Sequence, residues 1–221
     1  MSLNRLFLFL LCMLSLGACK EDYSYPNVLT ELAEVQTDAG GKLSKLTTDN
    51  GRTFSVKIQS AENKFVPDTL YRMLTVFEPL EEQNNQLKVY SAQPVFSKFA
   101  QPVSFFKEGI KTDPVDIQSI WYSGSYLNFI LCVQTKDKPH VFHFVDQGIH
   151  KMNQSETDSQ GKKVLELTFY HDRNKDYEAF TTKYCFSIPL KPYEKVLNKG
   201  DIIRLHLNTY KEGKVIRDFE Y

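Results

Sequence analysis

Residues 43–58 read LSKLTTDNGRTFSVKI and contain the clearest structural signal in the chain. The Asp-Asn-Gly turn at residues 49–51 separates two apolar runs, and an Asn-Gly pair there favours a tight hairpin because both central residues adopt positive φ. After the turn, Phe54, Val56 and Ile58 alternate with polar residues, as they would on a strand with one buried face. This stretch predicts an antiparallel β-hairpin.

The stretches on either side of the hairpin extend it to a five-stranded domain. Residues 29–37 fit either a strand or about two turns of helix, because the spacing of their apolar side chains suits both. After a loop, residues 70–77 and 87–96 are two further strand-like runs. Three strands, a loop and two strands predict a small curled sheet such as an OB-like barrel. We place this domain at residues 28–110, because prolines and a glycine interrupt residues 97–114.

The second half of the chain repeats the pattern of short strands. A Ser-Gly-Ser turn at residues 123–125 separates two apolar runs and predicts a hairpin. Apolar and polar side chains alternate in residues 165–169, 184–188 and 203–207. About seven short strands within about a hundred residues are typical of an Ig-like sandwich. The predicted fold class is therefore all-β, with an OB-like five-stranded barrel followed by an Ig-like β-sandwich at residues 111–221.

The N-terminus has the features of a lipoprotein signal peptide, which we assign to residues 1–18. Arg5 precedes an unbroken apolar run at residues 6–14. This run is shorter than the roughly 20 apolar residues that span a bilayer, and its length suits a signal peptide. The alternative is a short buried helix that opens a domain. The sequence at 16–19, Leu-Gly-Ala-Cys, resembles a bacterial lipobox, which implies that Cys19 is acylated and becomes the first residue of the mature protein. Two or more acyl chains give a stable membrane anchor.

The residues after the predicted lipidation site bear on where the protein is displayed. Lys20, Glu21 and Asp22 resemble the tag of Bacteroidetes lipoproteins that are exported to the cell surface, and the alternative is a charged, solvated linker. Residues 19–27 form the expected tether. The predicted location is the cell envelope, with the chain held at the outer membrane through the lipid on Cys19 and exposed at the surface.

Two further modifications are possible in the mature chain. Cys132 and Cys185 both lie in strand-like runs, and an oxidising envelope permits a disulfide between them. The alternative is a pair of small buried hydrophobic side chains. Asp68-Thr69-Leu70 resembles the O-glycosylation motif of Bacteroidetes, so Thr69 is a candidate glycan carrier.

Charge and motifs argue against most catalytic and nucleic-acid functions. The chain carries 27 Lys+Arg and 27 Asp+Glu, and a nucleic-acid binder usually has a basic face. It contains neither a Gly-x-Ser-x-Gly elbow nor a glycine-rich phosphate loop. The five histidines are scattered, which favours edge or surface positions over a metal site. We therefore expect no catalytic residues, no metal, no cofactor and no nucleic acid. Glycosidase carboxylates leave no local spacing signature, so a glycan-processing enzyme remains an alternative.

Exposed aromatic residues are the usual ligand contacts of OB sheets. Tyr71 and Tyr90 lie on the two later strands of the predicted barrel and are candidates for stacking on a ligand. The alternative is packing in the core or at a sheet edge. With a net charge near zero, a sugar or protein ligand is favoured over nucleic acid.

Several stretches in the same order resemble the NigD-like lipoproteins of Bacteroidetes. They include the lipobox and, further along the chain, residues 37–38, 49–51, 65–68, 113–115, 120–122, 126–128, 165–171 and 207–210. The resemblance implies an N-terminal OB-like domain and a C-terminal β-sandwich. It also implies an association with the production of, or immunity to, a bacteriocin, and it implies no catalytic residues.

These observations together predict a non-catalytic binding or interaction module of the cell envelope. The expected partner is a glycan or an envelope or toxin protein. Two alternatives stay open: a glycan-processing enzyme, and a structural or adhesin-type envelope subunit that exposes a sheet edge for strand addition.

Overall fold

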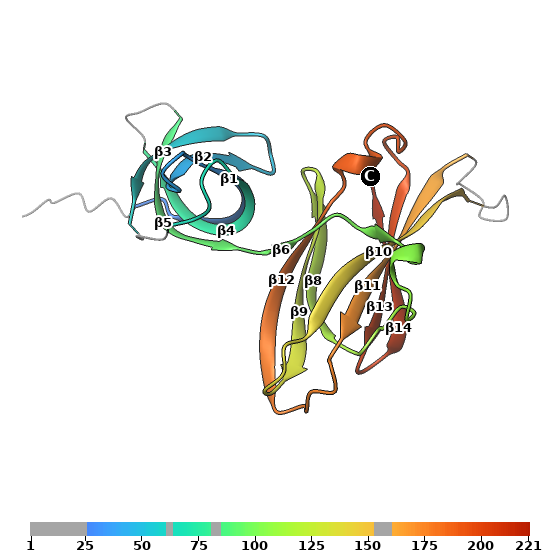
Figure 1. Cartoon of the computed structure of the whole chain (residues 1–221). Coiled ribbons are helices and arrows are strands. Elements are labelled where there is room, and N and C mark those ends of the chain that lie inside the picture. Colours follow the sequence, from blue (N-terminus) through green and yellow to red (C-terminus); the bar gives the residue numbers. More distant parts are fainter. Residues whose placement is uncertain (1–25, 61–63, 81–84, 153–160) are drawn as a thin grey trace, which may run out of the picture.

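The computed structural model describes residues 26–60, 64–80, 85–152 and 161–221 as an all-β protein with two bodies (Figure 1). A small barrel is followed by a larger pair of sheets, and the chain passes from one to the other at β6 (Figure 1). No helix within the described residues is long and apolar enough to cross a membrane. The predicted signal peptide, Cys19 and the segment from Lys20 to Asp22 lie outside the described residues.

The first body is a closed barrel with the strand order β1-β2-β3-β5-β4. All neighbouring pairs are antiparallel except β3 and β5, and β4 pairs with β1 to close the barrel. The OB-like five-stranded barrel is therefore confirmed. Its strands are β1 (Leu29–Thr37), β2 (Leu43–Thr48), β3 (Thr53–Gln59), β4 (Leu70–Pro79) and β5 (Gln86–Pro94).

The ambiguous run at residues 29–37 forms a strand because two neighbours pair with it along its length. β2 and β4 hydrogen-bond to its opposite edges, which a helix would not allow. Ala33 and Val35 point into the barrel core, and Glu34 between them points outward. Tertiary pairing thus decides between two local conformations that the sequence leaves open.

The loop between β3 and β4 is held against the turn that joins β1 and β2. The Phe65 N–H donates to the Gly41 carbonyl at 3.0 Å. Gly41 has φ +75°, and a Cβ there would lie 2.3 Å from the Phe65 carbonyl oxygen. Only glycine therefore allows this close approach.

The second body is a sandwich of a five-stranded sheet, β14-β13-β11-β10-β7, and a four-stranded sheet, β6-β12-β9-β8. Phe129, Phe144, Phe169 and Phe186 are almost fully buried between the sheets, with ring centroids 5.0–6.4 Å apart. The elements are β6 (Phe96–Ser97), β7 (Gln101–Pro102), η2 (Val103–Phe105), β8 (Asp116–Ser123), β9 (Tyr126–Thr135), β10 (Val141–Lys151), β11 (Lys163–Asp172), β12 (Phe180–Pro189), η3 (Lys191–Tyr193), β13 (Ile202–Thr209) and β14 (Gly213–Glu220).

The chain enters the sandwich earlier than the expected boundary near residue 110. The short strand β6 pairs with β12, and β7 pairs with β10, both in parallel. Phe96 packs against the rings of Phe142, Phe144 and Phe186. Composition placed the boundary too late because two-residue strands leave no alternation to detect.

Candidate functional site

A buried arginine joins the barrel to the sandwich. Arg72 lies on β4 with 6% of its surface exposed, and its guanidinium makes two hydrogen bonds to the Asp49 carboxylate, at 2.5 and 2.8 Å. Asp49 belongs to the turn between β2 and β3. The same guanidinium reaches the sandwich, donating to Asn128 Oδ1 at 3.1 Å and to Ser187 Oγ at 3.3 Å.

The sandwich closes around this pair from a second side. The Ser123 hydroxyl donates to Asp49 Oδ2, and the Arg72 guanidinium carbon lies 4.0 Å from the centroid of the Tyr126 ring. Gly124 has φ +58°, and a Cβ there would lie 3.1 Å from the Asp49 carbonyl oxygen. The two turns that the sequence marks most clearly therefore pack against each other. We call Asp49, Arg72, Ser123, Tyr126, Asn128 and Ser187 the Arg72 node.

A second polar contact lies beside the node. The Tyr126 hydroxyl donates to Glu34 Oε1 at 2.6 Å. Burial and the Glu34 carboxylate raise the pKa of Tyr126 well above its ordinary value, so the phenol keeps its proton.

The Arg72–Asp49 pair is bidentate, and bidentate arginine–carboxylate pairs fix geometry as well as adding energy. The barrel and sandwich therefore meet through directional contacts that specify one arrangement.

A cleft of about 550 Å³ opens beside the Arg72 node, between the barrel wall and the outer face of the four-stranded sheet. Most of its lining is apolar. Leu74 contributes from β4, Trp121 from β8 and Ile130 from β9. The other lining residues are Thr30, Glu31, Leu32, Asp49, Asn50, Ser123 and Cys185. A concave, mainly apolar site at a domain interface is the usual setting for ligand binding.

The described lining residues of the cleft include two carboxylates and one thiol. Of the two carboxylates among its described lining residues, Asp49 is already bonded to Arg72 and Ser123. Burial raises the pKa of the Cys185 thiol, with Arg72 opposing the shift, so this cysteine is a poor nucleophile at neutral pH. No histidine occurs among those same residues to act as a general base.

The structure does not bring the two candidate stacking residues together. The Tyr71 ring packs against Phe65, 5.5 Å between centroids, and its hydroxyl accepts the Val66 N–H at 3.0 Å. The Tyr90 hydroxyl donates to Glu78 Oε2 at 2.5 Å, with Lys88 Nζ 4.4 Å from its ring centroid. Neither residue lines the cleft described above. A stacking role for either stays a prediction.

Thr69 and the two cysteines also have defined surroundings. The Thr69 hydroxyl donates to the Pro67 carbonyl at 2.9 Å, and its glycosylation stays a prediction.

Cys132 and Cys185 are free and half-buried. Cys185 pairs with Ile130 and not with Cys132, so the two cysteines are diagonal neighbours on adjacent strands. Diagonal positions hold Cβ atoms further apart than the ~3.8 Å of a disulfide, which explains why the structure has no bridge there.

A buried histidine cluster is the feature that the sequence missed. The histidines were expected at sheet edges or at the surface, but the His140 and His171 side chains are buried, with 2.9 Å between His140 Nδ1 and His171 Nε2. His171 Nδ1 donates to the Asp113 carbonyl at 2.9 Å, and His140 Nε2 lies 3.3 Å from Asp176 Oδ2. We call His140, His171, Asp176 and the Asp113 carbonyl the His140 cluster.

The charges of the His140 cluster are set by burial and by backbone donors. Burial lowers the pKa of His171 below its ordinary value of 6.5. Burial alone would raise the pKa of Asp176, but backbone N–H groups, including those of Lys136, Asp137 and Lys138, outweigh it and hold this pKa well below its ordinary range. The described residues contain no group of three or more histidine, cysteine or acidic side chains that could hold a metal. The hydrogen bonds of the cluster connect His171 on β11 to the segments that carry Asp113 and His140, and His140 to the segment that carries Asp176.

Comparisons with known proteins identify the relatives of this chain. The family model described as the NigD-like C-terminal beta sandwich domain matches residues 98–221. The chain is 30% identical to a NigD-like immunity protein from Bacteroides caccae, with a TM-score of 0.70 over 90% of this chain and 99% of that chain. No curated protein matches the chain significantly.

More distant structures share the fold. A protein from Parabacteroides distasonis described as toxin-related is 18% identical, with a TM-score of 0.64 over 88% of this chain and 93% of that chain. A protein of unknown function from Bacteroides vulgatus is 16% identical, with a TM-score of 0.67 over 88% of this chain and 91% of that chain. At these identities the likeness shows the two-body architecture alone.

Proposed function

Since this chain belongs to the NigD-like family, we propose that it is a lipid-anchored lipoprotein of the cell envelope that binds a protein partner without catalysis. The partner is a bacteriocin-type antibacterial protein, and the binding site is the cleft beside the Arg72 node. The name of the Bacteroides caccae relative, an immunity protein, supports protection of the producing cell as the purpose of binding.

The observation that carries this proposal is an apolar cleft between two modules. Trp121 is the only tryptophan of the chain, and it lines the cleft together with Leu74, which is 36% exposed on the barrel. Tryptophan is enriched among the residues that dominate binding energy at protein interfaces. A preformed cleft also lowers the ordering cost of association. A rigid apolar cleft suits a folded partner or an extended segment of one.

The anchor part of the proposal rests on the sequence around Cys19. Acyl chains on this cysteine would place both β modules outside the cytoplasm, where an incoming antibacterial protein is met first. Lys20, Glu21 and Asp22 support display on the outer surface. Protease shaving of intact cells tests the display: the wild-type chain is expected to be cleaved from the cells. A Cys19→Ser variant is expected to leave the membrane fraction, and retention of that variant at the membrane would contradict the anchor.

The cleft part is tested by photo-cross-linking with a matched pair of positions. A photoreactive residue replaces Leu74 in one variant and Leu70 in the other. Both side chains are exposed on β4, but only Leu74 lines the cleft. Cells are exposed to the secreted antibacterial proteins of a competing Bacteroidetes strain. A protein joined through position 74 and absent at position 70 is expected, and equal products from both positions would contradict the proposal.

The proposal also assigns a distinctive signal to Trp121. Because no other tryptophan is present, a change in intrinsic tryptophan emission on adding the cross-linked protein reports the cleft directly. A Trp121→Phe variant removes the signal and serves as its control. Binding that leaves the emission unchanged would place the partner elsewhere.

A further inference from the structure

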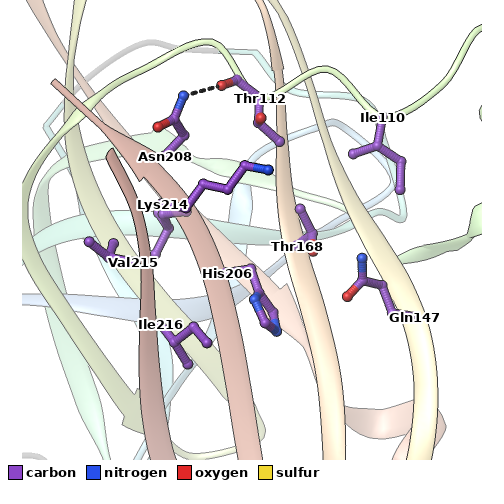
Figure 2. A pocket seen from close by; sticks show the side chains of 10 residues that line it. Ile110, Thr112, Gln147, Thr168, His206, Asn208, Lys214, Val215 and Ile216 are labelled. Atoms are coloured by element: carbon purple, nitrogen blue, oxygen red, sulfur yellow. Dashed lines mark hydrogen bonds between the residues drawn. The ribbon is translucent and has the colours of Figure 1, made fainter. Parts of the chain in front are cut away.

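A second hollow lies on the sandwich, over the outer face of the five-stranded sheet (Figure 2). Its volume is about 400 Å³, and the segment at residues 110–112 borders it beside β10, β11, β13 and β14. It is lined by Ile110, Thr112, Gln147, Thr168, His206, Leu207, Asn208, Lys214, Val215 and Ile216. None of these described lining residues is acidic, and Lys214 supplies their ammonium group.

A buried hydroxyl without a partner marks this hollow. Thr168 lies on β11 and is only 6% exposed. Its Oγ1 has no hydrogen-bond partner among the described residues. A buried hydroxyl without a partner is costly, and such groups in native structures call for an explanation. Thr168 lines the hollow, so a ligand bound there would supply the missing partner.

Three other groups can join Thr168 in binding. Figure 2 shows the Lys214 side chain extending across the hollow toward Thr112 and Thr168. The described residues offer no carboxylate that pairs with Lys214, and the Gln147 amide likewise makes no side-chain hydrogen bond within them. Asn208 is fixed by its bond from Nδ2 to the Thr112 carbonyl, at 2.7 Å (Figure 2).

Glu166, whose carboxylate contacts the lining residue His206, is already paired with other basic groups. Glu166 is bonded to His206 Nε2 and lies within 3.7 Å of His150 Nε2 and 3.6 Å of Arg204 Nη1. These contacts offset the charge of the Glu166 carboxylate. Among the described lining residues, the Lys214 ammonium is accompanied by hydroxyl, amide and imidazole groups and by aliphatic side chains, and by no carboxylate.

We propose that this hollow binds a carboxylate group of a polypeptide. The Lys214 ammonium supplies the charge, and the Thr168 hydroxyl and Gln147 amide supply directed donors, a combination that gives charge-assisted hydrogen bonds. Ile216, 51% exposed, and Ile110 flank the site and suit the aliphatic part of the residue that carries the carboxylate. The carboxylate comes either from a chain terminus or from an acidic side chain. This inference does not depend on the cleft.

Three short peptides distinguish the sources. They are acetyl-trialanine with a free C-terminal carboxylate, its C-terminal amide, and an amidated acetyl-Ala-Glu-Ala. Each is titrated into the ¹⁵N-labelled mature chain that carries Cys19→Ser, and the NMR signals of Thr168 and the Gln147 side-chain amide are followed. Shifts with the free-carboxylate peptide identify a chain terminus, and shifts with the glutamate peptide identify an acidic side chain. Shifts from the plain amide of the same size, or from none of the three, would overturn the proposal.

Variants connect the binding to the named groups. Lys214→Gln and Thr168→Val are each expected to weaken carboxylate binding by about tenfold, the loss typical of one charge-assisted hydrogen bond. Lys211→Gln is the matched control, because Lys211 is exposed on the same hairpin but does not line the hollow. Thr168→Val is close to isosteric, and an unchanged fold is verified from its NMR spectrum. Wild-type affinity in Lys214→Gln would contradict the assignment.

Discussion

The Arg72 node and the His140 cluster are both buried polar networks, but they connect different parts of the chain. The His140 cluster joins a strand of the sandwich to nearby loop segments through His140, His171 and Asp176. The Arg72 node joins a turn and a strand of the barrel to three strands of the sandwich. The first network therefore stabilises one module, whereas the second sets the arrangement of two modules and the shape of the cleft between them. Only the second bears directly on the proposed binding site.

The largest expected effect comes from breaking the Arg72 node. Asp49→Ala leaves the Arg72 guanidinium buried without its carboxylate, which is expected to cost about 3 kcal/mol at the interface between the modules. Domain orientation measured by NMR residual dipolar couplings is expected to change from one common alignment to two independent ones. Arg173→Ala is the control, because its ion pair with Glu178 is exposed and is expected to contribute less than about 1 kcal/mol. A common alignment that survives Asp49→Ala would show that the node does not fix the arrangement.

Lowering the pH is expected to affect the stability contributed by the His140 cluster, which distinguishes this cluster from the Arg72 node. The pKa of His171 is lowered by burial in the folded state, so the unfolded chain binds the extra proton first. This histidine costs no stability above its ordinary pKa of 6.5, and the cost grows as the pH falls below that value. One proton changes stability by at most about 1.4 kcal/mol per pH unit. Urea unfolding at pH 7.5 and pH 5.5 measures the slope.

Hydrogen bonds from backbone N–H groups, not burial, lower the pKa of Asp176, and this carboxylate affects stability at a lower pH than His171 does. Its carboxylate stabilises the fold above its ordinary pKa of 3.8, and this contribution is lost as the pH falls below that value. The two groups are therefore separable by pH. A His171→Gln variant is expected to flatten the slope between pH 7.5 and 5.5, and an unchanged slope would assign that acid sensitivity to other residues.

The smallest expected effect concerns the hollow on the sandwich. Thr168→Val removes a buried hydroxyl that has no partner among the described residues, so it is expected to raise the free energy of unfolding by about 1 kcal/mol. Urea unfolding of the variant and the wild type measures the difference. A loss of stability would mean that the hydroxyl is already satisfied in solution. This site thus differs from the Arg72 node, where removing a polar group is expected to be costly.

The sequence predicts the modules well but not their contact. Alternation and the turns at residues 49–51 and 123–125 correctly predict the barrel and the sandwich, because these signals are local. The contact between the two turns cannot be predicted from local sequence, because Asp49 and Ser123 lie far apart in the chain. Nothing in the sequence around Arg72 indicates that a second domain buries this side chain. The candidate cleft could therefore not be predicted.

The same limit explains why the burial of His140 and His171 was not predicted and why the domain boundary was placed too late. His140 and His171 lie on separate segments, and only the pairing of β10 with β11 brings those segments together. β6 and β7 are too short to show alternation, so their membership of the sandwich follows only from their partners. Local patterns reveal elements, while long-range pairing decides which polar groups meet.

A survival assay tests the proposed use of the cleft most directly. Cells that lack this protein are supplied with the wild-type chain, Leu74→Asp or Leu70→Asp, and are then challenged with the antibacterial proteins secreted by a competing strain. The two variants place the same charge on the same strand, inside and outside the cleft. Wild type and Leu70→Asp are expected to protect the cells, and Leu74→Asp is expected to leave them sensitive. Full protection by Leu74→Asp, or no protection by the wild type, would contradict the account.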